Sequence, residues 1–184
     1  MFEKERFIED CRAALQEGDV QGAVRELVER AVREPAAVVR ALGAPTRSGV
    51  ETIYRADDLT ILNLAWGPRM TVRPHDHRMW AVIGIYGGCE NNTFFRRSAQ
   101  GLAQHGTRQL KAKETERLGS NVIHAVTNEL DSITAAIHVY GGDFFATPRS
   151  EWDPATLTEQ PYDVEHTMRA FEEANRRLRA AATE

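Results

Sequence analysis

Two histidines separated by one residue are the part of this sequence best suited to chemistry. His75 and His77 stand on either side of Asp76, directly after Pro74. Side chains alternate along an extended strand, so both imidazole rings point to one face, about 6–7 Å apart. Neutral imidazole binds metal ions through a ring nitrogen, and two rings on one face can share an ion. The pair therefore predicts a metal site, although this spacing alone also arises by chance.

A third histidine, His124, stands in an apolar segment between Ile123 and Val126. An imidazole ring is costly to bury there unless one of its nitrogens has a partner. A hydrogen bond to a backbone carbonyl would meet that need, and so would a metal ion shared with His75 and His77. The three histidines together favour the metal. Because imidazole suits iron, zinc, copper and nickel about equally, the ligands alone do not identify the ion.

The residues around these histidines follow the two-residue period of β-strands. From residue 50 to about 145, short alternating segments are separated by Gly, Pro and Asn, and a polar loop is expected over 98–107. This pattern is typical of a β-sandwich or barrel. Residues 1–45 instead have the helical period, and a C-terminal helix is predicted over 160–182, with Asp163 as its N-cap. We expect a single domain, 1–184, with a barrel core over 50–145.

The composition argues against several classes of function. The chain has 184 residues, 42% of them hydrophobic, and a formal net charge of −4, so a basic surface for nucleic acid has no support. Its first residues lack the basic start and apolar run of a signal peptide, and no segment has the roughly 18 apolar residues of a membrane span. Two cysteines are too few for a disulfide framework. We expect a cytoplasmic protein.

The spacing of the histidines resembles the two-motif signature of the cupins. The first motif is His75-x-His77, and the second is Gly119-(x)4-His124-(x)3-Asn128. The resemblance implies a mainly β fold, the cupin double-stranded β-helix or jelly-roll barrel, with helices added at both ends. It also implies that both motifs lie at one mouth of the barrel.

The carboxylate ligand of most metal cupins is missing from its usual position. Those proteins have a glutamate a few residues after the second histidine of the first motif, whereas positions 79–82 here hold Met, Trp, Ala and Val. Glu90 lies too far along the chain to fill the same place. A set of three histidines without a carboxylate is similar to that of the thiol dioxygenases, the cysteine dioxygenase group.

Two other segments resemble this group. Trp66 stands before the histidine pair as a family tryptophan does, and His138-x-Tyr140 matches the family's His-x-Tyr. The resemblance implies catalytic roles, with Tyr140 near the bound substrate and oxygen and oriented by His138. Ala136 stands where the family usually has a serine, so the hydroxyl relay would end at His138 or be completed by water. The cysteine that cross-links to the tyrosine in the animal enzymes is also absent from its usual position, so no cross-link is expected.

Arg55 is the predicted substrate-binding residue. It precedes the Trp66 strand much as the family's carboxylate-binding arginine does, and a guanidinium suits bidentate recognition of a carboxylate. The alternative is a surface arginine on an edge strand. Arg73 and Arg78 flank the histidine pair, and either add positive potential at the barrel mouth or form salt bridges.

Together with the resemblance, these residues predict a non-haem iron thiol dioxygenase that holds one Fe(II) per chain through His75, His77 and His124. Both atoms of O2 would enter the thiol of a small mercapto-carboxylate to give a sulfinate. The candidate substrates are 3-mercaptopropionate, mercaptosuccinate and cysteine. The alternatives are another metal-dependent cupin enzyme, using zinc, nickel or manganese, and a cupin that binds a ligand without turnover. The expected partners are the anionic thiol and O2, without nucleic acid or membrane, in a monomer or homodimer.

Overall fold

The computed structural model describes residues 2–99 and 101–181. Three helices come first: α1 Lys4–Ala14, α2 Val20–Arg33 and α3 Pro35–Leu42. The strands and a fourth helix follow: β1 Gly49–Arg55, β2 Thr60–Trp66, β3 Thr71–Asp76, β4 Ala81–Gly87, β5 Cys89–Ser98, β6 Gly101–Lys111, β7 Thr115–Leu118, β8 Ile123–Thr127, β9 Thr134–Tyr140, β10 Ser150–Trp152, β11 Glu159–Pro161 and α4 Val164–Ala181.

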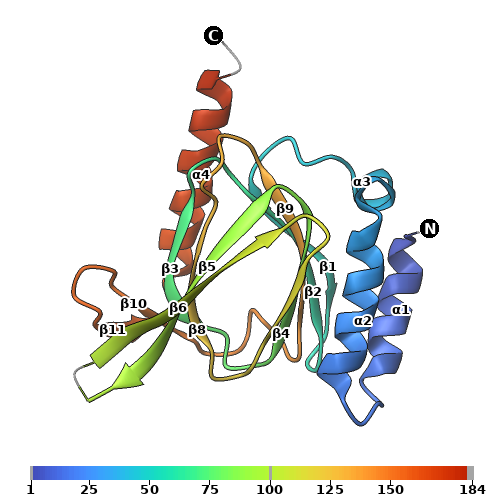
Figure 1. Ribbon diagram of the computed structural model, residues 1–184, viewed down its shortest axis with the longest axis horizontal. Coiled ribbons are helices and arrows are strands. Elements are labelled where there is room, and N and C mark those ends of the chain that lie inside the picture. Colours follow the sequence, from blue (N-terminus) through green and yellow to red (C-terminus); the bar gives the residue numbers. More distant parts are fainter. Residues whose placement is uncertain (1, 100, 182–184) are drawn as a thin grey trace.

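The strands form two antiparallel sheets that enclose a common interior (Figure 1). One sheet has the order β1-β2-β9-β4-β7, and the other has the order β11-β10-β3-β8-β5-β6. Strands that are distant in the sequence are neighbours, as β2 is with β9 and β3 is with β8. This interleaved order is that of a double-stranded β-helix. The predicted fold class, a mainly β jelly-roll barrel with helices at both ends, is confirmed.

β9 contributes to two separate hydrophobic cores. Ala136 and Tyr140 pack inside the barrel, whereas Ile137 and Val139 pack against the N-terminal helices. The helices α1, α2 and α3 lie over the outer face of the five-stranded sheet, and α2 buries Val28 there (Figure 1). Because both faces of β9 are covered, every residue of this strand is buried. Its near-continuous apolar sequence follows from that position.

α4 packs against β3 and against Trp66 at the end of β2. Its Phe171 stacks on Trp66, with ring centroids 5.7 Å apart, and its Ala174 is buried. The helix begins after Asp163, the predicted N-cap, and not at residue 160, because β11 occupies residues 159–161. The Asp163 carboxylate accepts a hydrogen bond from the backbone N–H of His166. The last residue predicted for this helix, 182, lies outside the described residues. No helix in the described part of the chain is long and apolar enough to cross a membrane.

The prediction of a polar loop over residues 98–107 is wrong. β5 runs to Ser98 and pairs with β6, which begins at Gly101, in a hairpin that projects beyond the barrel (Figure 1). The pairing of β5 with β8 ends at Phe95, so the outer part of the hairpin exposes most of its side chains and lacks apolar alternation. The six-stranded sheet also extends past residue 145, because β10 joins β3 opposite His75.

β3 contains a bulge directly before the histidine pair. Val72 pairs with Val126 and His75 pairs with His124, so three steps along β3 match two steps along β8. The irregularity falls at residues 73–74, and the proline there cannot donate to the ladder. Residues three apart on a regular strand face opposite sides, but here Val72 and His75 both line the barrel interior.

Candidate metal centre

The three histidines of the two motifs lie together inside the barrel. His75 is on β3, His77 follows the end of β3, and His124 lies opposite His75 on β8. His77 Nε2 is 3.1 Å from His75 Nε2 and 3.4 Å from His124 Nε2, and the candidate ligand atoms all lie within 4.8 Å of one another. Each of the three residues is at most 6% exposed. The two motifs therefore meet at one point, as expected, while the role of the rings as ligands stays a prediction.

Hydrogen bonds on the outer side of two rings turn their Nε2 atoms inward. His75 Nδ1 lies 2.8 Å from the carbonyl oxygen of Arg73, and His124 Nδ1 lies 2.6 Å from Asn92 Oδ1. Both of these partners are acceptors, so each Nδ1 carries the proton. Each Nε2 then keeps a lone pair that faces the shared centre, as in the hydrogen-bonded histidine ligands of metal sites.

Burial keeps the three rings neutral at physiological pH. Desolvation lowers the pKa of His75 to about 4, and it lowers the pKa values of His77 and His124 well below their usual range, with further lowering from neighbouring histidines. Neutral imidazole is the form that binds metal. Lone pairs that face one another repel unless a cation lies between them. The buried triad therefore fits a metal ion.

The donor set narrows the kind of ion. Among residues 2–99 and 101–181, the three histidines form a cluster that no carboxylate or thiol joins. Nitrogen ligands of this kind suit iron, zinc, copper or nickel, whereas calcium and magnesium prefer oxygen ligands. Three protein ligands also leave coordination positions open, which is the pattern of catalytic rather than structural metal sites.

The triad lines a cavity of about 150 Å³ in the barrel interior. Its walls come from both sheets, the segment 144–149 and α4, and most of them are aliphatic or aromatic. The volume is below the roughly 300–1,000 Å³ of sites for drug-sized ligands. Four exposed large hydrophobic residues also line this cavity and mark its opening to solvent: Val50, Phe145, Val164 and Met168. The cavity suits a small molecule.

Arg149 is a further candidate that the sequence did not reveal. Its guanidinium carbon lies 3.9 Å from the ring centroid of Phe144 and 4.3 Å from that of Tyr162, and it lines the cavity of the triad. Its Nη1 is buried without a hydrogen-bond partner among the described residues. Burial also lowers the pKa of Arg149, yet a guanidinium stays charged at working pH. A buried cation with an unused donor is suited to binding an anion.

Arg55, the predicted substrate-binding residue, lies outside the lining of this cavity. Its guanidinium forms a bidentate pair with Asp143, at 2.9–3.1 Å, and its side chain is 49% exposed. This is the surface arginine that the sequence offered as the alternative. A role for Arg55 in substrate binding stays a prediction, and Arg149 is the better placed residue.

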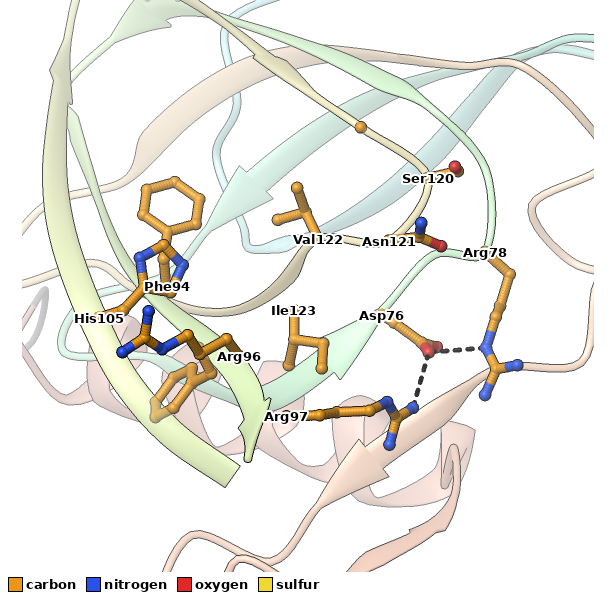
Figure 2. Close-up of a pocket in the computed structure, with 12 residues that line it drawn as sticks. Asp76, Arg78, Phe94, Arg96, Arg97, His105, Ser120, Asn121, Val122 and Ile123 are labelled. Carbon is orange, nitrogen blue, oxygen red and sulfur yellow. Dashed lines mark hydrogen bonds and ion pairs between the residues drawn. The ribbon is translucent and has the colours of Figure 1, made fainter. Parts of the chain in front are cut away.

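The arginines that flank the histidine pair form salt bridges. Arg73 Nη1 donates to Glu151 Oε1 at 3.1 Å, and Arg78 Nε donates to Asp76 Oδ2 at 2.7 Å. Figure 2 shows the Asp76 carboxylate between Arg78 and Arg97, in a second cavity at the base of the β5–β6 hairpin. That cavity is larger, at about 730 Å³, but the triad does not line it. Its size alone does not make it the site of the metal chemistry.

His138 and Tyr140 line the same cavity as the triad. Tyr140 Oη lies 3.0 Å from His138 Nδ1, as expected of a hydrogen-bonded pair. On the other side of the ring, His138 Nε2 lies 3.4 Å from Glu90 Oε2. The sequence predicted that the hydroxyl relay would end at His138 or be completed by water. In the structure, the Glu90 carboxylate occupies this position beside His138. The alternation of Glu90, Asn92 and Phe94 along β5 could have revealed that Glu90 points into the barrel.

Zinc(II) tests the triad without any assumption about activity. Added zinc should stabilise the metal-free protein by about 2.7 kcal/mol at a free concentration one hundred times its Kd. His124→Ala should lose this stabilisation, because one of three ligands is gone. His105→Ala should keep it, because His105 is exposed and lines the second cavity. Calorimetric unfolding with and without zinc makes the comparison, and an equal response of both variants would contradict the site.

The lowered histidine pKa values predict a pH dependence of the metal-free protein. Unfolded histidine binds its proton near pH 6.5, whereas folded His75 binds it only near pH 4. The unfolded state therefore gains protons first, and stability is lost as the pH falls from about 6.5 to about 4. A difference of one pKa unit between the folded and unfolded states corresponds to 1.36 kcal/mol, so His75 alone contributes about 3 kcal/mol to the free energy of unfolding above pH 6.5. Denaturant unfolding at several pH values measures this, and His75→Gln should reduce the slope. A stability that stays constant from pH 6.5 to 4.5 would be inconsistent with three buried neutral rings.

The comparisons with known proteins find similar folds at low sequence identity. No family model matches the chain. An RmlC-like cupin family protein from Methanocaldococcus jannaschii, with a double-stranded β-helix fold, aligns with a TM-score of 0.46 and 13% identity, over 55% of this chain and 85% of that one. The DMSP lyase DddQ from Ruegeria pomeroyi aligns with a TM-score of 0.44 and 17% identity, over 56% and 50%.

An oxalate oxidase in complex with glycolate aligns with a TM-score of 0.42 and 17% identity, over 54% of this chain and 53% of that one. Similarity at this level assigns neither a family nor an activity to this chain. Its fold class rests on its own strand order, and its candidate metal centre rests on the three buried histidines.

Proposed function

We propose that the protein is a non-haem iron(II) thiol dioxygenase that converts the thiol of a small mercapto-carboxylate to a sulfinate. One observation carries the proposal: among the described residues, three neutral imidazoles converge without a carboxylate in a small cavity that is also lined by Arg149, whose buried Nη1 has no hydrogen-bond partner. Iron(II), when bound by the three histidines, would supply redox chemistry and open positions where a thiolate and O2 can meet.

The charge of the ligand set favours an anionic sulfur. His75, His77 and His124 are neutral, so they do not offset the charge of a divalent ion. Such a site favours the thiolate over the thiol and lowers the pKa of a bound thiol. A ligand set with a carboxylate would weaken this preference.

Arg149 would hold the carboxylate of the substrate. Its position between the rings of Phe144 and Tyr162 fixes the plane of the guanidinium, which reduces the entropy lost when an anion binds. The buried Nη1 supplies a donor that the protein leaves unused. A carboxylate there would remove the cost of an unpaired buried cation.

The rest of the cavity favours a substrate without an amino group. None of the described residues that line it is an aspartate or glutamate, so an ammonium group would be desolvated beside the Arg149 cation without a countercharge. Aliphatic side chains such as Leu62, Leu64 and Val126 instead suit a short hydrocarbon chain. We therefore favour 3-mercaptopropionate or mercaptosuccinate over cysteine.

Tyr140 and His138 would act on the reacting sulfur or oxygen. Tyr140 lines the cavity, and Tyr140 and His77 have ring centroids 5.0 Å apart. Burial raises the pKa of Tyr140 far above its usual value, so its hydroxyl stays protonated and available for hydrogen bonding. His138 orients this hydroxyl through the 3.0 Å contact.

Oxygen consumption tests the reaction directly. The iron-loaded protein should consume about one O2 per thiol with 3-mercaptopropionate or mercaptosuccinate, and sulfinate should appear in equal amount, because both oxygen atoms enter the sulfur. Cysteine should react with a lower kcat/KM. An oxygen electrode and mass spectrometry of the product make the measurement. Stoichiometric iron with no thiol-dependent uptake, or uptake without sulfinate, would refute the proposal.

Two arginine variants identify the residue that binds the carboxylate. Arg149→Gln should raise the KM for 3-mercaptopropionate about 10- to 100-fold, since a hydrogen bond to a charged group contributes roughly 1.5–3 kcal/mol. The same variant should change the KM for 1-propanethiol little, because that thiol has no carboxylate. Arg55→Gln should have a small effect on both thiols. A rise in KM with Arg55→Gln and none with Arg149→Gln would instead assign the carboxylate to Arg55.

A further inference from the structure

Glu90 is a fully buried carboxylate close to the candidate metal centre but not part of it. It is 0% exposed, and no lysine or arginine pairs with it in the described part of the chain. Its partners are instead three ring or amide nitrogens of the barrel interior. Burying a charge in this way is costly, so such a group calls for an explanation beyond packing.

The three partners divide between the two carboxylate oxygens. Trp66 Nε1 donates to Oε2 at 2.6 Å, and His138 Nε2 lies 3.4 Å from the same oxygen. Asn92 Nδ2 donates to Oε1 at 2.9 Å. Burial raises the pKa of Glu90, but His138, Asn92 and Trp66 together hold that pKa below its usual value. An ionised carboxylate is acceptor-only, so every atom that faces it must be a donor.

This requirement determines the proton position on His124. Because Asn92 turns its NH2 group to Glu90, its carbonyl oxygen faces His124 Nδ1 at 2.6 Å. His124 Nδ1 must then carry the proton, and its Nε2 is left free to face His77 Nε2. The carboxylate thus acts on a candidate metal ligand through one amide.

The same requirement determines the proton position on His138. Its Nε2 is buried and meets the criteria for a hydrogen bond with none of the described residues. It lies 3.4 Å from a carboxylate oxygen, where a lone pair would be repelled and an N–H would be attracted. With the proton on Nε2, His138 Nδ1 is an acceptor. Tyr140 Oη, at 3.0 Å, must then donate its proton to Nδ1. The oxygen of Tyr140, a residue that lines the cavity, is then left with lone pairs that can accept a hydrogen bond.

We propose that Glu90 is a positioning residue that fixes the protonated nitrogen of both His124 and His138, and thereby makes Tyr140 a hydrogen-bond acceptor toward the substrate. The substrate part rests on the proposed function. The thiol S–H bond breaks, and its electron pair stays on sulfur. The proton goes to Tyr140 Oη, while the former Tyr140 proton forms a bond to His138 Nδ1. The resulting imidazolium lies beside the Glu90 carboxylate, which stabilises its charge.

Glu90→Gln is the informative variant because it keeps the shape of the side chain but has one acceptor oxygen and one NH2 group. Trp66, Asn92 and His138 cannot all donate to it. If the NH2 group faces His138, the His138 proton moves to Nδ1. If it faces Asn92, that amide turns over and His124 loses its acceptor.

Nitrogen-15 NMR of the full-length zinc-loaded protein reads these proton positions without any turnover. The unchanged chain should have His138 protonated at Nε2 and His124 protonated at Nδ1. Glu90→Gln should either move the His138 proton or shift the His124 Nδ1 signal, because that nitrogen loses its acceptor. Tyr140→Phe should leave His138 protonated at Nε2, because Glu90 and not Tyr140 determines it. Glu26→Gln, an exposed position on α2, is the matched control and should change neither histidine.

Protonation of His138 at Nδ1 in the unchanged chain would overturn the proposal, and this result does not depend on any variant folding. Identical histidine signals in Glu90→Gln and the unchanged chain would overturn it as well. With iron, Glu90→Gln should lower kcat/KM for the thiol about 100-fold or more, the range of general acid–base catalysis. If the unchanged chain oxidises no thiol while the NMR response to Glu90→Gln is seen, the proposed function fails and the positioning role stands.

Discussion

The bulge in β3 is the constraint on which the candidate metal centre depends. Without the register shift between Val72 and His75, a residue at position 75 would face the outside of the barrel whenever Val72 faced inside. The shift lets Val72 pack in the core while His75 meets His124 across the ladder. It also frees the carbonyl of Arg73 from regular pairing, and His75 Nδ1 donates to that carbonyl. The bulge therefore determines both the direction in which the His75 ring points and which of its nitrogens carries the proton.

Among the described residues, two buried polar side-chain atoms have no hydrogen-bond partner, and the others do. Trp66, Asn92, His124 and Glu90 satisfy one another in a network that α4 and the sheets close off from water. In the described part of the chain, the buried side-chain atoms without a hydrogen-bond partner are His138 Nε2 and Arg149 Nη1. The first faces a carboxylate, and the second belongs to a residue that lines the cavity. Unsatisfied buried groups are rare in native proteins because they are costly, so both atoms call for an explanation.

Much of the fold and part of the site could be predicted from the sequence. The change from helical to two-residue period near residue 50 separated the N-terminal helices from the barrel, and the apolar surroundings of His124 indicated a buried ring with a partner. The outer β5–β6 hairpin could not be recognised, because exposed strands have no apolar face to set a period.

The rest of the site depends on contacts that leave no local pattern. Arg149 lies in a segment without periodicity, and its contacts with the rings of Phe144 and Tyr162 arise only when the chain folds. Glu90 does lie in an alternating strand, but its importance depends on His138, which comes from the opposite sheet. The composition of the sequence and the spacing of its residues do not predict which strands face each other across a barrel.

Arg149 lines the same cavity as three neutral histidines, so the anions of the buffer should affect what binds there. A divalent ion would add two positive charges to a cavity that already contains the positive charge of Arg149. Within residues 2–99 and 101–181, no anionic side chain lines that cavity. Opposite charges attract strongly where water is scarce. Chloride, formate or acetate from the medium would be drawn into this space in the resting state. Such ions would compete with any organic acid, so the apparent affinity for a substrate would depend on the buffer.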